Sequence, residues 1–254
     1  MPALLLSTFL CAGCFVKEDR HGCPCSLLLD FTGVDASVVD SVSVVALSGN
    51  SVILSETVYA DAFDKAYAAS LPRTDKVMLT ALSCVDGFLE GTEAMLIPYG
   101  MDCPPVYMFA KAVNTDCERV CVAVELRKSF CRLKVHVENE EDFPFRLVVR
   151  GEVDGYMTDG TPSEGEFRCS ASEIVEGVFC VLLPRQTDSS LALDIDDGTD
   201  VLKTFALGEI LAAGGYDWSA PDLDDIIVGI DYARSELTVS VQGWDKVYTF
   251  DFVI

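Results

Sequence analysis

The chain has 254 residues, half of them hydrophobic, which is enough to bury the core of one large domain or of two ordinary ones. Its formal net charge of −23, from 41 acidic against 18 basic residues, repels nucleic-acid phosphates and anionic lipid headgroups. The composition therefore argues against nucleic-acid binding and against docking of the protein surface on a membrane. After the N-terminal segment, no stretch reaches the ~18 consecutive apolar residues that span a bilayer.

The N-terminal segment has the pattern of a bacterial lipoprotein signal. An uncharged apolar run, Ala3 to Leu10, leads to a small Ala-Gly pair and then to Cys14. Small side chains let a signal peptidase approach the chain closely, and the cysteine thiol is the nucleophile that accepts the lipid. We predict a lipoprotein signal peptide over residues 1–13 and acyl chains such as palmitate on Cys14. The alternative is a simple secretory signal that is cut elsewhere.

The residues after Cys14 predict where the protein is held. Lys17, Glu18 and Asp19 resemble the surface-export signal that lipoproteins of one group of Gram-negative anaerobes carry after the lipidated cysteine. A solvated tether has the same composition, and this interpretation stays open. We expect residues 14–25 to form a lipidated tether that holds the protein at the cell outer membrane, exposed on its surface.

The chain has eleven cysteines, and removal of Cys11 with the leader and lipidation of Cys14 leave nine. An odd number leaves at least one thiol unpaired, and the sequence does not specify the pairing. We expect Cys121 and Cys180 to be small core residues, because each alternates with apolar residues in a strand-like run. The chain holds two histidines and no pair of C-x-x-C motifs, so we predict no metal site.

From Ser26 onward, apolar and β-branched residues alternate with polar ones, and turn residues separate the runs. This period of two predicts an all-β chain. Helical spacing is limited to Asp61–Ala69 and Phe205–Ala213. The predicted strands are Leu27–Phe31, Val42–Leu47, Val52–Tyr59, Val77–Leu82, Val106–Ala112, Val120–Leu126, Cys131–Val137, Phe145–Arg150, Gly177–Leu182, Leu191–Ile195, Ile226–Tyr232, Leu237–Val241 and Val247–Val253.

Two segments of the chain echo each other. Leu-Pro-Arg occurs at residues 71–73 and again at 183–185, each time at the end of an apolar run and before a further strand. The echo favours two similar β-sandwich domains in tandem. We place the N-terminal sandwich at residues 26–126 and the C-terminal sandwich at residues 127–254, with a short join that leaves them packed or only slightly hinged.

The order and spacing of several segments resemble the fimbrillin-A-associated anchor family, the lipoproteins that anchor fimbriae in those anaerobes. The resemblance starts in the tether, continues at Cys23-Pro24-Cys25 and is longest in the second half of the chain. The segments that carry it there are Leu182-Leu183-Pro184-Arg185-Gln186, Gly215-Tyr216-Asp217-Trp218, Asp222-Leu223-Asp224-Asp225-Ile226 and Gly243-Trp244. The resemblance implies two transthyretin-like Greek-key β-sandwiches and a structural subunit at or near the base of a fimbrium (pilus).

The resemblance also implies the partners. Fimbrial structural subunits are expected to bind through a sheet edge or a face, because a sheet edge with unpaired N–H and C=O groups accepts a strand from another chain. The last predicted strand, which runs up to residue 254, leaves no trailing segment to donate, and we interpret this as typical of a terminal subunit. Membrane contact is expected through the N-terminal lipid alone. No cofactor, nucleic acid or small-molecule substrate is expected.

Two clusters have both a ligand-binding and a structural interpretation. Asp194, Asp196, Asp197 and Asp200 would suit calcium, but we favour a hairpin turn because no glutamate closes the loop. The aromatic residues Tyr216, Trp218, Tyr232 and Trp244 would suit a sugar-stacking platform, but core packing explains them without a ligand. The sequence has no G-x-S-x-G or H-E-x-x-H motif, and we predict that the protein is not an enzyme. The alternative function is a surface lipoprotein that binds a glycan or a host ligand outside a fibre.

Overall fold

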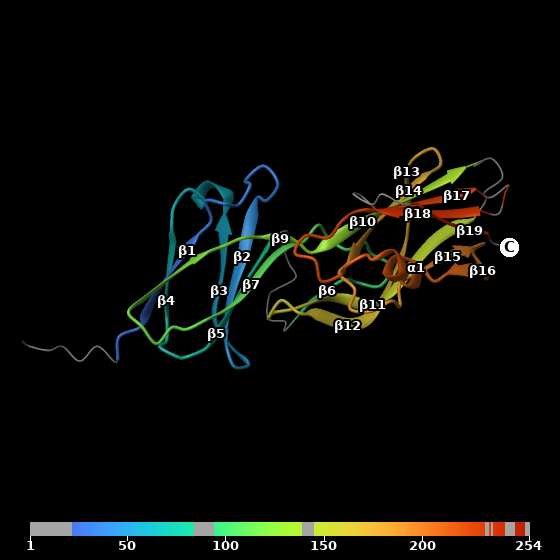
Figure 1. Cartoon of the computed structure of the whole chain (residues 1–254). Coiled ribbons are helices and arrows are strands. Elements are labelled where there is room, and N and C mark those ends of the chain that lie inside the picture. Colours follow the sequence, from blue (N-terminus) through green and yellow to red (C-terminus); the bar gives the residue numbers. More distant parts are fainter. Residues whose placement is uncertain are drawn as a thin grey trace, which may run out of the picture.

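The computed structural model describes residues 22–83, 94–138, 145–231, 234, 236–241 and 247–251. This part of the chain is mostly β-strand, from β1 (Cys25–Asp30) to β19 (Tyr248–Asp251), and its α-helix is α1 (Leu207–Gly214). The predicted all-β class is confirmed. Figure 1 shows two groups of strands, with β1 to β5 in one and β10 to β19 in the other.

The first group of strands forms two sheets (Figure 1). One sheet has three strands in the order β4-β1-β8, where β4 is Tyr67–Leu71 and β8 is Arg119–Ala123. The other has five strands in the order β3-β2-β5-β7-β9. Its strands are β2 (Ser41–Ser48), β3 (Ser51–Tyr59), β5 (Val77–Ser83), β7 (Tyr107–Val113) and β9 (Arg127–Lys128).

The second group forms two further sheets. One has six strands in the order β13-β14-β10-β17-β18-β19, and the other has the order β12-β11-β15-β16, with β6 pairing to β11. The bounds of these strands are β6 (Ala94–Leu96), β10 (Phe130–Glu138), β11 (Arg146–Met157), β12 (Pro162–Ser170), β13 (Ser172–Val175), β14 (Val178–Pro184), β15 (Ala192–Asp196), β16 (Val201–Phe205), β17 (Ile226–Asp231) and β18 (Glu236–Val241).

The same pairing pattern occurs in both groups. β1 pairs antiparallel with β4 and parallel with β8, and β10 pairs in the same way with β14 and β17. β2 pairs with β3 and β5, as β11 pairs with β12 and β15. The two Leu-Pro-Arg segments lie at the ends of β4 and β14, which are equivalent strands in this pattern. The sequence echo thus coincides with a repeated topology, while the domain limits 26–126 and 127–254 stay a prediction.

Alternation of side chains builds the two main cores. In β1, Leu27 and Leu29 are fully buried and Leu28 between them is half-buried. In β10, Leu133 and Val135 are fully buried, whereas the residues on either side of them face outward. Each fully buried leucine or valine contributes about 1.5–3 kcal/mol relative to an exposed one.

A third, smaller core joins the two groups of sheets. It consists of Leu82 of β5, Met95 of β6, Val106 and Tyr156 of β11, all between 0 and 1% exposed. Tyr107, the residue after Val106, packs against both main cores, and its ring meets the Phe130 ring edge-on with the ring centroids 5.6 Å apart. After β5 the chain crosses to the second group, where β6 pairs with β11, and then returns to the first group as β7. The sequence did not predict this crossing.

Several expected elements differ from the structure. The predicted helix at Asp61–Ala69 is wrong: a 3₁₀ turn, η1 (Ala60–Ala62), is followed by β4, which pairs with β1. A helix this short is marginal without tertiary packing, and pairing with β1 satisfies the backbone instead. The predicted helix near Phe205–Ala213 is confirmed as α1, which ends at Gly215 in the left-handed conformation at φ 85°.

The core prediction for Cys121 is also wrong. Cys121 is exposed, because the buried face of β8 carries Val122 and the side chains on either side of it point the other way. Cys180 in β14 is only half-buried. Alternation in the sequence indicates that one face of a strand is buried, but it does not say which face. The prediction assigned Cys121 to the buried face of β8, whereas the structure places it on the exposed face.

Candidate functional site

The predicted site residues Cys14, Lys17, Glu18 and Asp19 lie outside the described residues. The first described residue is Gly22, three residues before β1. There the carbonyl of Cys23 accepts a 2.8 Å hydrogen bond from Nε of Arg73. The end of the predicted tether is therefore held against the turn that follows β4.

Two edge strands of the second group expose apolar side chains. β13 ends the six-stranded sheet, with Ile174 54% and Val175 59% exposed. β16 ends the neighbouring sheet, with Val201 47% and Leu202 36% exposed. Edge strands present backbone donors and acceptors to further strands, and exposed apolar side chains add area for a partner to bury.

The four aspartates from 194 to 200 belong to the hairpin that joins β15 to β16, as predicted. Oδ1 of Asp197 accepts hydrogen bonds from the backbone N–H groups of Asp200 at 2.9 Å and Thr199 at 2.8 Å. These bonds hold the pKa of Asp197 below its usual range. Asp194 is buried and accepts bonds from Nε of Arg150 at 2.9 Å and from Oγ1 of Thr204 at 2.6 Å. The carboxylates of Asp194 and Asp197 are thus occupied by donors of the chain itself.

No group of three or more histidine, cysteine, aspartate or glutamate side chains within the described ranges is arranged to hold a metal ion. Nor does this part of the chain contain a helix that is long and apolar enough to cross a membrane.

The aromatic pair Tyr216 and Trp218 packs on the core of the second group, as the structural interpretation predicts. The two rings meet edge-on, with their centroids 4.7 Å apart. Oη of Tyr216 donates a 2.8 Å hydrogen bond to the carbonyl of Asp224. Arg185 donates to the carbonyls of Trp218 and, at 2.8 Å, of Ala220. Tyr232 and Trp244, the other aromatic residues of that prediction, lie outside the described residues.

Polar contacts fasten β9 to the second group of sheets. The backbone N–H of Lys128 donates to Oδ1 of Asp222 at 2.8 Å, and its Nζ pairs with Oδ1 of Asp225 at 2.6 Å. The same Asp225 oxygen accepts the backbone N–H of Arg132 at 2.9 Å. Burial raises the pKa of Asp225, but the hydrogen bonds from Lys128 and Arg132 outweigh it and hold the pKa below its usual value. Since β9 also pairs with β7, this contact links the two groups.

We expect Lys128→Met to lower the free energy of unfolding by about 1–2 kcal/mol at pH 7, because a partly buried charge pair is lost. Since the pKa of Asp225 is lower in the folded state, its contribution is present above the ordinary carboxyl range and is lost as the pH falls. The difference between the variant and the native protein should therefore shrink below about pH 4. Urea denaturation at pH 7 and at about pH 3.5 measures this difference in the free energy of unfolding. The control is Lys111→Met, because Lys111 is exposed and its replacement should leave stability nearly unchanged. An undiminished difference at the lower pH would contradict the pairing.

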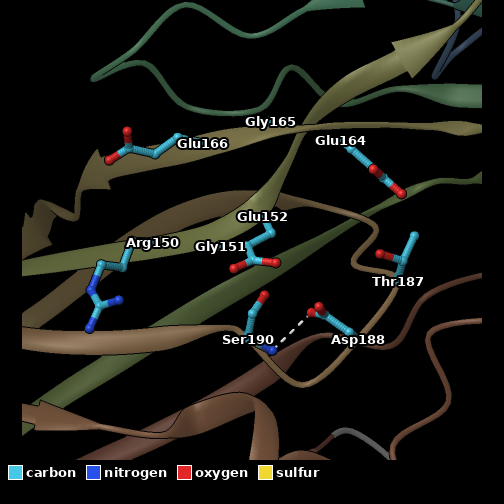
Figure 2. A pocket seen from close by; sticks show the side chains of 9 residues that line it. All are labelled: Arg150, Gly151, Glu152, Glu164, Gly165, Glu166, Thr187, Asp188 and Ser190. Carbon is cyan, nitrogen blue, oxygen red and sulfur yellow. Dashed lines mark hydrogen bonds between the residues drawn. The ribbon is translucent and has the colours of Figure 1, made fainter.

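An acidic cavity of about 500 Å³ lies beside β11 and β12 (Figure 2). Glu152, Glu164 and Glu166 line it together with Asp188 and Arg150. Asp188 accepts a 2.9 Å hydrogen bond from the backbone N–H of Ser190, and bonds from Ser190 lower the pKa of its carboxyl. The lining holds hydroxyl groups but no histidine to activate them. Its negative charge suits a cationic group.

A larger cavity of about 930 Å³ spans the two groups of sheets. It is lined by the β2–β3 turn, by residues 74–76 before β5, and by Met157, Thr158 and Asp159 at the end of β11. Clefts between domains are common ligand sites. Sequence reasoning missed this cavity and the acidic one, because their lining residues come from strands far apart along the chain.

No protein-family model matches the chain, and no curated protein sequence matches it either. Solved structures do match over almost its full length, and they belong to fimbrial anchor proteins and candidate adhesins or polysaccharide-binding proteins of Bacteroidetes. The chain therefore has the β-fold of this class of surface proteins, and the expected resemblance is confirmed at the level of fold.

Among these structures is the fimbrial anchor protein Mfa2 from Porphyromonas gingivalis, at a TM-score of 0.62 and 13% identity, with 87% of this chain and 98% of that chain covered. A candidate polysaccharide-binding protein from Bacteroides thetaiotaomicron follows at a TM-score of 0.61 and 11% identity, with 89% and 98% covered. A candidate adhesin from Bacteroides ovatus has a TM-score of 0.60 and 12% identity, with 92% and 97% covered.

Proposed function

We propose that this chain is a structural, non-enzymatic lipoprotein that anchors a fimbrium to the outer membrane and lies at or near its base. The observation that carries the proposal is the fold shared with a fimbrial anchor protein, Mfa2, along nearly the whole of both chains. The lipoprotein pattern at Cys14 supports attachment, since it supplies a lipid at the end of the chain that precedes β1.

In this proposal the lipid holds Cys14, residues 15–25 form the tether, and the strands form a body that carries load. The contacts at the join suit that task. The third core and the Lys128–Asp225 pair connect the two groups of sheets, so that a pull on one end is transmitted to the other. A body that transmits force needs packed contacts at the join rather than a loose linker.

The fibre subunit binds at a sheet edge in this proposal. The edges β13 and β16 offer backbone groups and exposed Ile174, Val175, Val201 and Leu202. A partner strand that pairs with either edge would satisfy backbone groups and cover these apolar side chains in one step.

Replacement of Cys14 tests the anchor. We expect Cys14→Ala to be released from the membrane fraction into the medium, because several acyl chains make membrane attachment durable and the variant has no thiol to receive them. A palmitate analogue fed to the cells should label the native protein and not the variant. The control is Cys23→Ala in the same tether, which should stay in the membrane and stay labelled. If Cys14→Ala remains labelled, lipidation at this residue is wrong.

The alternative is a surface lipoprotein that binds a glycan or a host ligand outside a fibre. The cavities beside β11 and between the two groups of sheets favour it, as do the polysaccharide-binding and adhesin descriptions of two structures with the same fold. Co-purification of fibre subunits with the tagged protein from native cells supports the anchor. Saturable binding to an oligosaccharide array, with no fibre subunit recovered, supports the alternative.

A further inference from the structure

We propose that Cys25 and Cys117 form a disulfide in the exported protein, and that this bond fastens the membrane tether to the first sheet. Their Sγ atoms lie 3.9 Å apart, although the residues are separated by 92 positions in the chain. The inference rests on the proposed function in one respect, because a protein displayed outside the cytoplasm meets oxidising conditions.

The backbone already holds the two cysteines side by side. Cys25 is the first residue of β1 and is fully buried, and Cys117 lies half-buried just before β8. The backbone N–H of Ser26 donates to the carbonyl of Glu118 at 2.9 Å, and β1 and β8 pair in parallel from that point. To reach the S–S bond length of about 2.0 Å, the two sulfurs at 3.9 Å must approach by roughly 1.9 Å. The proposal requires that rotation of the two side chains closes this gap.

Two other described cysteines have polar neighbours of their own. Sγ of Cys103 donates to the carbonyl of Pro104 at 3.2 Å, and Sγ of Cys169 lies 3.1 Å from Oδ1 of Asp102. Burial raises the pKa of the Cys131 thiol to about 12, and burial raises the pKa of the Cys25 thiol as well, so the pKa does not separate these two residues. Cys23 is exposed, and its carbonyl is held by Arg73. Cys25 and Cys117 are the pair whose sulfurs the structure holds in contact, at 3.9 Å.

The bond forms by thiol–disulfide exchange with a disulfide-carrying dithiol oxidoreductase of the export compartment. The more exposed Cys117 loses its proton and attacks the disulfide, one sulfur of the oxidoreductase leaves as a thiolate, and a mixed disulfide forms. Cys25 then loses its proton and attacks the sulfur of Cys117, which releases the second sulfur of the oxidoreductase. The two cysteines lose two electrons and two protons, and the oxidoreductase becomes a dithiol.

The bond would change how the body carries load. A pull on the lipid tether enters at residue 25, and without a covalent link β1 resists it through non-covalent contacts alone, namely its hydrogen bonds to β4 and β8 and the burial of Leu27 and Leu29. With the bond, part of the pull passes directly into the chain that begins β8. The closed loop spans the chain from β1 to residue 117, so the bond also restricts a long stretch of the unfolded chain.

Peptide mapping of the full-length protein, extracted from native membranes and alkylated without reduction, tests the pairing. Cleavage after lysine and arginine places Cys25 in residues 21–65 and Cys117 in residues 112–119. We expect these two peptides to be joined. Since Cys23 shares the first peptide, Cys23→Ser is the matched control and should keep the link, whereas Cys25→Ser should lose it. Reduction should lower the melting temperature of the native protein by roughly 5–10 °C and leave that of Cys117→Ser unchanged.

The outcomes separate the disulfide from the anchor. If Cys25 and Cys117 are both alkylated in protein that is lipidated and exported, and also after oxidised glutathione is added to the purified protein, the disulfide is wrong and the anchor stands. A link that survives in Cys25→Ser and disappears in Cys23→Ser overturns the pairing as well. If the protein is found in the cytoplasm with its leader uncut, the anchor proposal fails, and a link formed with oxidised glutathione still supports the pairing.

Discussion

Tyr156→Ala is expected to lower the free energy of unfolding by about 4–5 kcal/mol, the largest loss of any single change proposed for this protein. Tyr156 is fully buried in the small core that joins the two groups of sheets, against Leu82, Met95 and Val106. Truncation of a buried aromatic ring costs about 3–5 kcal/mol from lost packing and the cavity left behind. Since whole domains are stable by only about 5–15 kcal/mol, the variant should be close to unfolding at physiological temperature.

The hydroxyl of Tyr156 adds a polar contribution to this loss. It donates to the carbonyl of Ser129 and accepts the backbone N–H of Arg185 at 2.9 Å. Tyr156→Phe keeps the ring but leaves both backbone groups without this partner, and it should cost about 1–3 kcal/mol.

Urea denaturation of the full chain measures both Tyr156 variants. Tyr99→Ala is the matched control, because Tyr99 is 68% exposed and its removal should change stability by no more than about 0.5 kcal/mol. A loss below about 1 kcal/mol for Tyr156→Ala would show that the small core does not hold the two groups together.

Gly155→Ala should displace β6 and cost about 2–3 kcal/mol, the second largest effect that we expect. A Cβ atom at Gly155 would lie 2.0 Å from the carbonyl oxygen of Met95 and 3.0 Å from Cα of Leu96. Both contacts are to the backbone of β6, which pairs with β11 at this position, so that no side-chain rotation relieves the overlap. β6 has to move, and the burial of Met95 is lost with it.

Hydrogen exchange reports the displacement directly. The amide of Ile97 donates to the carbonyl of Asp154 at 2.7 Å, and this amide should exchange faster in Gly155→Ala than in the native protein. The control is Gly33→Ala, because a Cβ atom at Gly33 meets nothing within 4 Å. Equal exchange at Ile97 in the two variants would show that β6 does not depend on the close approach at Gly155.

Several strands with one buried face could be predicted from the sequence, although β12, which alternates over nine residues, and β16 were missed. β1, β2 and β10 lie within one or two residues of the predicted ranges, because one buried face per strand leaves a period of two. α1 was predictable from its helical spacing and from the glycine at its end. By contrast, β6 has three residues and β13 four, which is too short for any period to appear.

The candidate site likewise has a part that could be predicted from the sequence and a part that could not. The proposed signal at Cys14 and the charged residues after it is recognisable in the sequence, because such a signal consists of residues that are consecutive in the chain. The edges β13 and β16 were not predictable, because a strand is an edge here when no further strand of the described residues pairs with it. The cysteine predictions show this most clearly: Cys121 is exposed, and Cys25 has a neighbour 92 residues away.

By itself, the sequence determined the β class, the turns at the aspartates from 194 to 200, and the repeat carried by the two Leu-Pro-Arg segments. These properties depend on residues that are close together in the chain. Packing of the whole chain, in contrast, specifies that β1 pairs in parallel with β8, that β6 crosses to β11, and that the thiols of Cys25 and Cys117 meet. Alternation specifies which side of a strand is buried, but every open strand offers the same backbone groups, so the choice of partner depends on how the whole chain packs.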